Sequence, residues 1–270
     1  VDIEQPFSNV PTIESSQTEV AGLVVANVNS TYLVLTSSSL LEPGMNYIVR
    51  LSDEVQTEAA FVCRNTASGI GIVSINASKL TAEQRNSIAV AQLDNSYMVK
   101  QGDLVIASGK LYETSKGVSY GTIAGSKVEY SKDSGYEVFE TSVSITAGGF
   151  AILFNSEGNV VGVSKASTDT SSKFIGISDL KAQIETMINE HGIMYCGITG
   201  QNVTEELAAK YGLPSGVYIS NVDIDSPAYY AGLQAGDVIS AINGQSVLTI
   251  QQFSEKLYPV SYTHLTLPTN

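Results

Sequence analysis

The apolar residues between positions 19 and 176 fall in short runs, rich in Val, Ile and Leu, that glycine, serine and asparagine separate. Such runs predict β-strands, and only residues 80–87 (LTAEQRNS) carry a helical period. Many short strands at close spacing are typical of an all-β sandwich or barrel. The predicted strands are AGLVVANV, TYLVLTS, NYIVRLS, AAFVCRN, IGIVSI, DLVIASG, AILF and NVVGVS.

The pattern becomes helical after position 177. A helix is predicted over 179–191, with Ser178 as its N-cap and Gly192 as its stop. We expect this helix to link the β-rich region to a separate C-terminal unit.

That unit is predicted most clearly by residues 225–245, DSPAYYAGLQAGDVISAINGQ. Ser226 can cap a short helix that has Pro227 at its first position, and Gly232 can end it in a left-handed conformation. Asn243-Gly244 is the strongest two-residue hairpin signal in the chain. The order of helix, strand and hairpin indicates a small α+β domain.

A second helix of this unit begins at Thr249, which can form a capping box with Gln252. The helix carries three apolar residues on one face, namely Ile250, Phe253 and Leu257. That face is expected to pack on the unit's core.

Together with residues 195–219 (YCGITGQNVTEELAAKYGLPSGVYI), this region resembles the PDZ domain of HtrA-type (DegP-like) serine proteases. In that family a Tyr-x-Gly-Ile loop presents backbone N–H groups to the terminal carboxylate of a bound peptide. Successive N–H groups around a glycine form an anion-binding nest, and an extended peptide can add to an exposed strand edge. The matching residues here are Tyr195, Cys196, Gly197 and Ile198.

The resemblance also implies a pocket for the last side chain of the peptide. Its lining is predicted to be Ile198, Phe253 and Leu257. The alternative is that these three are core residues only, which is the commoner role of each taken alone.

The β-rich region resembles the double β-barrel of the same proteases. The expected fold class is therefore mainly β: a trypsin-like double β-barrel, a linking helix and a C-terminal α+β PDZ domain. Residues 36–41 (TSSSLL) match the segment of the catalytic histidine, 68–73 (SGIGIV) that of the aspartate, and 147–163 the nucleophile motif with the strand after it. The three catalytic positions then hold Ser39, Gly69 and Gly149, a degenerate triad.

A serine nucleophile needs a neighbouring base, normally histidine oriented by a carboxylate. The chain has two histidines, His191 and His264, and both lie outside the predicted barrels. Three lysines offer an alternative base, at positions 79, 100 and 165, but each is more typical of a solvated surface. The sequence therefore predicts a pseudoprotease with no catalytic residues.

Charge and cysteine content narrow the possible partners. The net charge of -13, from 14 basic and 27 acidic residues, argues against nucleic acid or an anionic membrane surface. No apolar run approaches the roughly 18 residues of a membrane span. Cys63 and Cys196 fall in different predicted domains, so we expect no disulfide, no metal site and no cofactor, and we interpret both as small buried hydrophobic residues.

The chain is expected to divide into five segments. The last of them resembles one reading frame of a sequencing adapter, and position 1 is not a start methionine, so we expect a fragment whose PDZ domain lacks its final strand. The segments are a linker or arm at 1–18, the protease-like double β-barrel at 19–177, the linking helix at 178–192, the PDZ domain at 193–259 and the tail at 260–270.

Three functional hypotheses follow. The first is a catalytically inactive HtrA-like protein that binds C-terminal or extended peptides as an adaptor, sensor or regulator in protein quality control. The second is an active HtrA-type endopeptidase, and the third is a structural barrel with a vestigial PDZ domain. The resemblance further implies an extracytoplasmic location, and as partners an active HtrA relative or further copies of the same chain.

Overall fold

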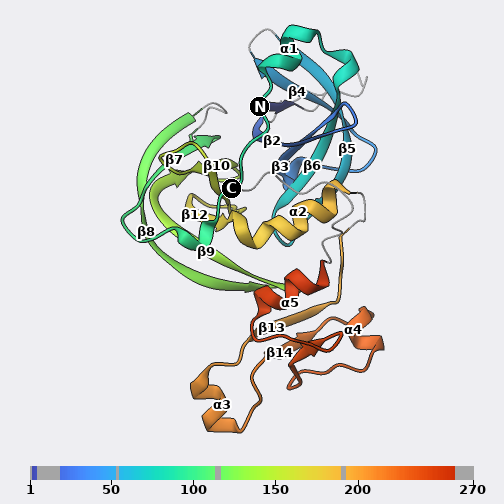
Figure 1. Ribbon diagram of the computed structural model, residues 1–270, viewed down its shortest axis with the longest axis vertical. Coiled ribbons are helices and arrows are strands. Elements are labelled where there is room, and N and C mark those ends of the chain that lie inside the picture. The colour runs from blue at the N-terminus through green and yellow to red at the C-terminus, as the bar shows by residue number, and fades with distance from the viewer. Residues whose placement is uncertain (1, 5–18, 53–54, 113–116, 190–192, 259–270) are drawn as a thin grey trace.

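The structure is a computed structural model that describes residues 2–4, 19–52, 55–112, 117–189 and 193–258. Two closed β-barrels lie side by side, and a smaller unit of strands and helices lies beyond them (Figure 1). This is the mainly β architecture expected from the sequence. The predicted tail at 260–270 and both histidines lie outside the described residues.

Six antiparallel strands close the first barrel in the order β1-β2-β3-β6-β5-β4. The arm predicted at 1–18 is wrong at its start, because β1 pairs with both β2 and β4 and completes the barrel. Closure leaves no unpaired strand edge. The strands are β1 (Asp2–Glu4), β2 (Val20–Val28), β3 (Thr31–Ser37), β4 (Asn46–Ser52), β5 (Val55–Asn65) and β6 (Ile70–Asn76).

Six further strands close the second barrel in the order β10-β11-β12-β9-β8-β7. They are β7 (Leu104–Gly109), β8 (Gly117–Ser131), β9 (Ser134–Ile145), β10 (Ala151–Phe154), β11 (Val160–Ser164) and β12 (Ser171–Gly176).

The two longest of these strands, β8 and β9, are missing from the predicted set. Only Gly117 and Ile123 of β8 are buried, so this strand presents no apolar run to be recognised. The two strands form a hairpin around the two-residue turn Lys132-Asp133, and this hairpin extends beyond the barrel toward α5 (Ile250–Leu257) (Figure 1).

Short helical segments connect the strands of the barrels. The helix predicted at 80–87 is present as α1 (Ala82–Ser87), and Thr81 and Gln84 form a complete capping box at its start. The other segments are the 3-10 turns η1 (Ser38–Leu40), η2 (Ala77–Lys79) and η3 (Ser96–Met98).

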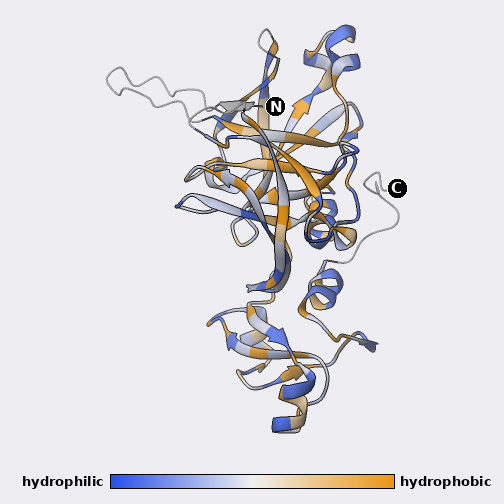
Figure 2. Ribbon diagram, turned by 90° about the vertical axis from the view of Figure 1, so that its left-hand side faces the viewer, coloured by the Kyte–Doolittle hydropathy of each residue, from blue (hydrophilic) through white to orange (hydrophobic). Residues whose placement is uncertain are grey.

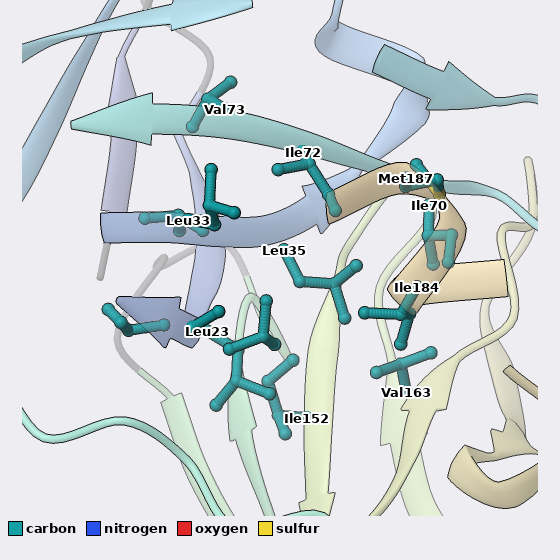
Figure 3. Close-up of a cluster of buried hydrophobic side chains, with 14 of the residues drawn as sticks. Leu23, Leu33, Leu35, Ile70, Ile72, Val73, Ile152, Val163, Ile184 and Met187 are labelled. Carbon is teal, nitrogen blue, oxygen red and sulfur yellow. The ribbon is translucent and has the colours of Figure 1, made fainter. Parts of the chain in front are cut away.

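Both barrels share one apolar core with the linking helix. Leu35 and Ile72 of the first barrel and Ile152 and Val163 of the second lie close to Ile184 of α2 (Lys181–Ile188) (Figure 3). Interiors of this kind are close-packed, so the two barrels and α2 form one mechanical unit.

The start of the linking helix differs from the prediction. A 3-10 turn, η4 (Ile177–Leu180), precedes α2, and Ser178 does not cap the helix. Its hydroxyl oxygen accepts a hydrogen bond from the Ser96 N–H at 2.8 Å, and the Ser96 hydroxyl accepts one from the Ser178 N–H at 3.0 Å. This reciprocal pair fixes η3 to η4 and replaces the cap.

The small C-terminal unit mixes apolar and polar stretches, whereas the barrel strands carry longer apolar ones (Figure 2). Its own core is made of Ile198, Val217, Ile219, Ala228, Val247, Ile250 and Phe253. Among the described residues, no helix is long and apolar enough to cross a membrane. The elements are β13 (Ile198–Asn202), α3 (Glu205–Tyr211), β14 (Val217–Val222), α4 (Pro227–Tyr230), β15 (Val238–Ile239), β16 (Ala241–Ile242), β17 (Gln245–Ser246) and α5 (Ile250–Leu257).

Most local signals of this unit act as predicted. The Ser226 hydroxyl accepts from the Tyr229 N–H and caps α4. Asn243 and Gly244 have φ of 50° and 76°, as a two-residue hairpin turn requires, and join β16 to β17.

Only one of the two hydrogen bonds of the capping box predicted at α5 is formed. Thr249 caps the helix by accepting from the Gln252 N–H. The Gln252 side chain, however, accepts from the Leu248 N–H at 2.9 Å.

Candidate functional site: degenerate triad and carboxylate loop

The structure brings two of the predicted triad positions to adjacent loops. The Ser38 N–H donates to the Gly69 carbonyl at 2.9 Å, which places η1 beside the turn before β6. Ser39 is exposed, and its hydroxyl lies 2.8 Å from that of Ser37. This hydroxyl pair holds no group that could take a proton at neutral pH.

Gly69, the predicted counterpart of the aspartate, faces the second barrel. A Cβ atom at this residue would lie 3.0 Å from the Ala166 Cβ, and the backbone has φ +78°. A methyl group therefore occupies the space into which a carboxylate would project. Since left-handed backbone also disfavours side chains, the position suits glycine.

Gly149, the predicted counterpart of the nucleophile, is closely surrounded by backbone atoms. A Cβ atom there would lie 2.3 Å from the Lys110 carbonyl oxygen and 2.9 Å from the Ile145 Cγ2. The Gly149 N–H donates to the Thr146 carbonyl at 2.9 Å, and the Gly148 N–H donates to the Ser167 carbonyl at 3.0 Å. An oxyanion hole needs N–H groups aimed at a reacting oxygen, and these two are already satisfied within the protein.

Two of the three candidate lysines form ion pairs with glutamate side chains. Lys79 Nζ lies 2.6 Å from Glu58 Oε2, and Lys165 hydrogen-bonds Glu129. Lys100 is exposed at the end of its loop. None of the three is placed by a described contact at the triad positions.

The predicted carboxylate-binding segment, residues 195–198, is here called the carboxylate loop. Its amides converge on a carboxylate from another part of the chain, that of Asp133 at the tip of the β8–β9 hairpin. Gly197 N–H lies 2.8 Å from Asp133 Oδ1 and 2.9 Å from Oδ2, Cys196 N–H lies 2.9 Å from Oδ2, and Ile198 N–H lies 2.8 Å from Oδ1. Hydrogen bonds to an ionised acceptor are the stronger class, so this loop binds carboxylate.

The backbone of Asp133 is also bound. Its N–H donates to the Ile198 carbonyl at 2.8 Å, and the preceding residue, Lys132, forms an antiparallel bridge with Thr199 of β13. The hairpin tip thus pairs with the edge of β13 through one bridge. Asp133 is 4% exposed, so its carboxylate is shielded from water.

The three residues predicted to line a side-chain pocket lie together at the C-terminal unit's core. Ile198 and Phe253 are buried, and Leu257 packs partly buried against them. The second arm of the hairpin contacts the same helix, because the Ser134 hydroxyl lies 3.0 Å from that of Ser254. The structure is therefore compatible with both the pocket and the core interpretation of these residues.

The Tyr195 side chain is linked to the hairpin tip through Asp223. Its hydroxyl donates to Asp223 Oδ2 at 2.7 Å, and Lys132 Nζ lies 2.7 Å from the same oxygen. The hydrogen bond from Lys132, followed by that from Tyr195, lowers the pKa of Asp223. This exposed cluster fixes the hairpin tip beside the carboxylate loop.

Both cysteines are free and only partly buried. The predicted full burial of the two side chains is therefore wrong. Burial, and after it the negative charge of Asp133, raises the pKa of Cys196 to about 11. Cys63 instead points its thiol toward the Met187 carbonyl at 3.6 Å.

Cys196 is expected to resist alkylation at neutral pH. Because the thiolate is the reactive form, the iodoacetamide rate at Cys196 should rise about tenfold per pH unit between pH 7 and 9.5. Mass spectrometry of a Cys63→Ser variant measures this rate at a single thiol. A plateau near pH 8.5 would contradict the raised pKa.

Asp133 is the central contact residue that sequence reasoning missed. It lies between two predicted strands, DLVIASG and AILF, in a stretch for which no element was expected. A two-residue turn between strands is readable from SKDSG at 131–135, but no sequence signal links that turn to residues 65 positions further on.

Comparisons with known proteins agree with this architecture. Residues 21–163 match the trypsin-like peptidase domain family, and residues 218–267 match the PDZ domain family. A "Probable periplasmic serine endoprotease DegP-like" of Pseudomonas savastanoi pv. phaseolicola is 27% identical over 226 residues, covering 80% of this chain and 46% of the relative. The relative of the same description from Ectopseudomonas mendocina is 28% identical over 226 residues, with the same coverage of 80% and 46%.

Solved structures share the fold. The HtrA-type protease AlgW with a decapeptide has a TM-score of 0.63 at 19% identity and covers 96% of this chain and 87% of its own. AlgW with a tripeptide has a TM-score of 0.63 at 22% identity, covering 96% and 84%. The chain spans about half the length of the curated relatives it matches.

Proposed function

Since the chain belongs to the HtrA-type family of trypsin-like proteins with a C-terminal PDZ domain, we propose that it is a catalytically inactive member that binds the C-termini or extended segments of other proteins. The observation that carries this proposal is the carboxylate loop. Three amides, those of Cys196, Gly197 and Ile198, already bind the Asp133 carboxylate, and a terminal carboxylate is the same chemical group.

The absence of triad chemistry supports the inactive state. Hydrolysis through serine needs a nucleophile, a base and donors for the oxyanion. The positions that should supply the first two hold Gly149 and Ser39, and the Gly149 amide is bonded to Thr146. The family's usual reaction therefore has none of its parts at these positions.

The strand edge of β13 supports recognition of extended peptides. It pairs with Lys132 as an antiparallel neighbour, so its outer edge is able to accept the kind of pairing that β-augmentation uses. AlgW, which shares this fold, has been solved with a decapeptide and with a tripeptide. By analogy we assign peptides with a free carboxylate to the carboxylate loop of this chain.

The cellular role follows from the family. We place the protein outside the cytoplasm, because the relatives are described as periplasmic. Its partners on this account are proteins with exposed C-termini, together with an active HtrA relative or further copies of the same chain. It acts there as an adaptor, sensor or regulator of protein quality control.

Two experiments separate this function from the alternatives. An active endopeptidase incorporates a fluorophosphonate probe at one serine stoichiometrically, whereas the proposed pseudoprotease remains unlabelled. A fluorescent peptide with a hydrophobic, free C-terminus should bind, and its amidated counterpart should bind at least about tenfold more weakly, since it cannot replace charge-assisted hydrogen bonds. Equal binding of the two peptides favours the structural barrel with a vestigial PDZ domain.

A further inference from the structure

The tip of the β8–β9 hairpin copies the end of a peptide. A C-terminal residue offers a carboxylate and, next to it, a backbone N–H. Asp133 offers the same two groups, because its side chain binds three amides of the carboxylate loop while its own N–H donates to the Ile198 carbonyl at 2.8 Å.

Lys132, the residue before Asp133, also resembles part of a bound peptide. Lys132 pairs antiparallel with Thr199, on the β13 edge where an incoming peptide would add as a strand. Its ammonium group also lies 2.7 Å from Asp223 Oδ2, and the resulting ion pair is half-exposed. The tip thus takes up the carboxylate loop and the strand edge at once.

The second arm of the hairpin, at the start of β9, packs against α5. A Cβ atom on Gly135 would lie 2.2 Å from the Ile250 Cγ2, so the β9 backbone approaches this helix as closely as glycine allows. The buried pair of Ser134 and Ser254 hydroxyls, 3.0 Å apart, fixes the arm there. The hairpin thus contacts both β13 and α5, the two elements between which we expect a bound peptide to lie.

We propose that the β8–β9 tip is an internal ligand of the carboxylate loop, which a peptide with a free terminal carboxylate must displace. This inference rests on the proposed peptide-binding function and adds its regulation. Two carboxylates cannot share the same three amides, so the hairpin-bound and peptide-bound forms exclude each other. The apparent Kd for peptide then equals the intrinsic Kd divided by the fraction of molecules in which the hairpin is released.

Asparagine at position 133 is the most conservative way to weaken the internal ligand. Asp133 has φ +56°, a left-handed conformation that asparagine adopts readily, so the turn is preserved. The substitution removes the charge and turns an NH₂ group toward amide donors. Asp169 is exposed on a loop of the same barrel, and D169N removes an equal charge away from the contact.

The test measures fluorescence anisotropy with two peptides, one with a free hydrophobic C-terminus and its amidated counterpart, on the full chain. D133N is expected to bind the free acid about tenfold more tightly than the wild type, while D169N binds like the wild type. Equal affinity of D133N and wild type, with the free acid still preferred, would overturn the internal ligand alone. Loss of that preference in every variant would overturn the proposed function beneath it.

A second variant and a second readout guard against a local effect of asparagine. Gly135→Val suits a strand but meets Ile250, so it should separate the hairpin from α5 and tighten peptide binding as D133N does. Hydrogen exchange of the Cys196, Gly197 and Ile198 amides should accelerate at least about tenfold in D133N without peptide, because asparagine lacks the charge and offers one acceptor oxygen in place of two. Unchanged protection of these amides in both variants would contradict the proposal.

Discussion

Replacing Gly197 with valine is expected to weaken binding of free C-terminal peptides at least about 100-fold. Gly197 has φ +91°, and a Cβ atom would lie 2.2 Å from the Ser226 Cβ, so the loop must move. Movement misaligns amides whose hydrogen bonds to a charged acceptor contribute about 1.5–3 kcal/mol each. Losing two of them corresponds to more than a hundredfold in Kd.

Gly212→Val is the matched control. Gly212 has a left-handed φ of +65° at the end of α3, but no atom lies within 4 Å of its Cβ position. It shares the backbone strain and lacks the steric clash. Titration by fluorescence anisotropy, in the wild-type chain and in the D133N background, checks the prediction with circular dichroism as the measure of folding. Peptide binding by folded G197V within a few fold of the wild type would contradict the role of the carboxylate loop.

Restoring the three triad residues is expected to destabilise the barrels without creating a protease. Serine at 149 meets the Lys110 carbonyl oxygen, and aspartate at 69 meets Ala166 with its backbone left-handed. Overpacking costs about 1–3 kcal/mol per site and left-handed backbone about 1–2 kcal/mol. The S39H/G69D/G149S variant should therefore lose about 3–8 kcal/mol of unfolding free energy, which urea denaturation measures.

The single variants locate the cause of that loss. Ser39 is exposed, so S39H alone should change the unfolding free energy by no more than about 0.5 kcal/mol. G69D and G149S should share nearly all of the cost, since G69D adds a left-handed backbone to its contact with Ala166, and G149S meets backbone carbonyl oxygens that cannot swing aside. A triple variant as stable as the wild type, or one that cleaves a fluorogenic peptide, would show that the active-site scaffold is intact.

Much of the architecture could be predicted because its signals are local. Strands such as β3 and β6 carry continuous apolar residues, and Ser226 and Asn243 act within four residues of their own position. The strand β1 was missed because three residues are too short for a period, and β8 because its faces are mostly exposed. Ser178 was assigned as a cap because only the folded chain brings Ser96 to it.

In the candidate site, too, only the residues with local signals could be predicted from the sequence. The carboxylate loop at 195–198 could be predicted because its conformation depends on the local glycine, Gly197. Its occupant could not, because the contact between Asp133 and Ile198 joins residues 65 positions apart. Such a contact depends on the length of the β8–β9 hairpin and on how the second barrel sits against the small unit.

Amide NMR can show whether the carboxylate loop receives the terminal carboxylate of a peptide. The free-acid peptide titrated into ¹⁵N-labelled D133N should shift the Cys196, Gly197 and Ile198 amide resonances to saturation, while the amidated peptide shifts them little. Such shifts are expected because these three N–H groups change acceptor. Saturable binding of the free acid that leaves all three resonances in place would contradict the account.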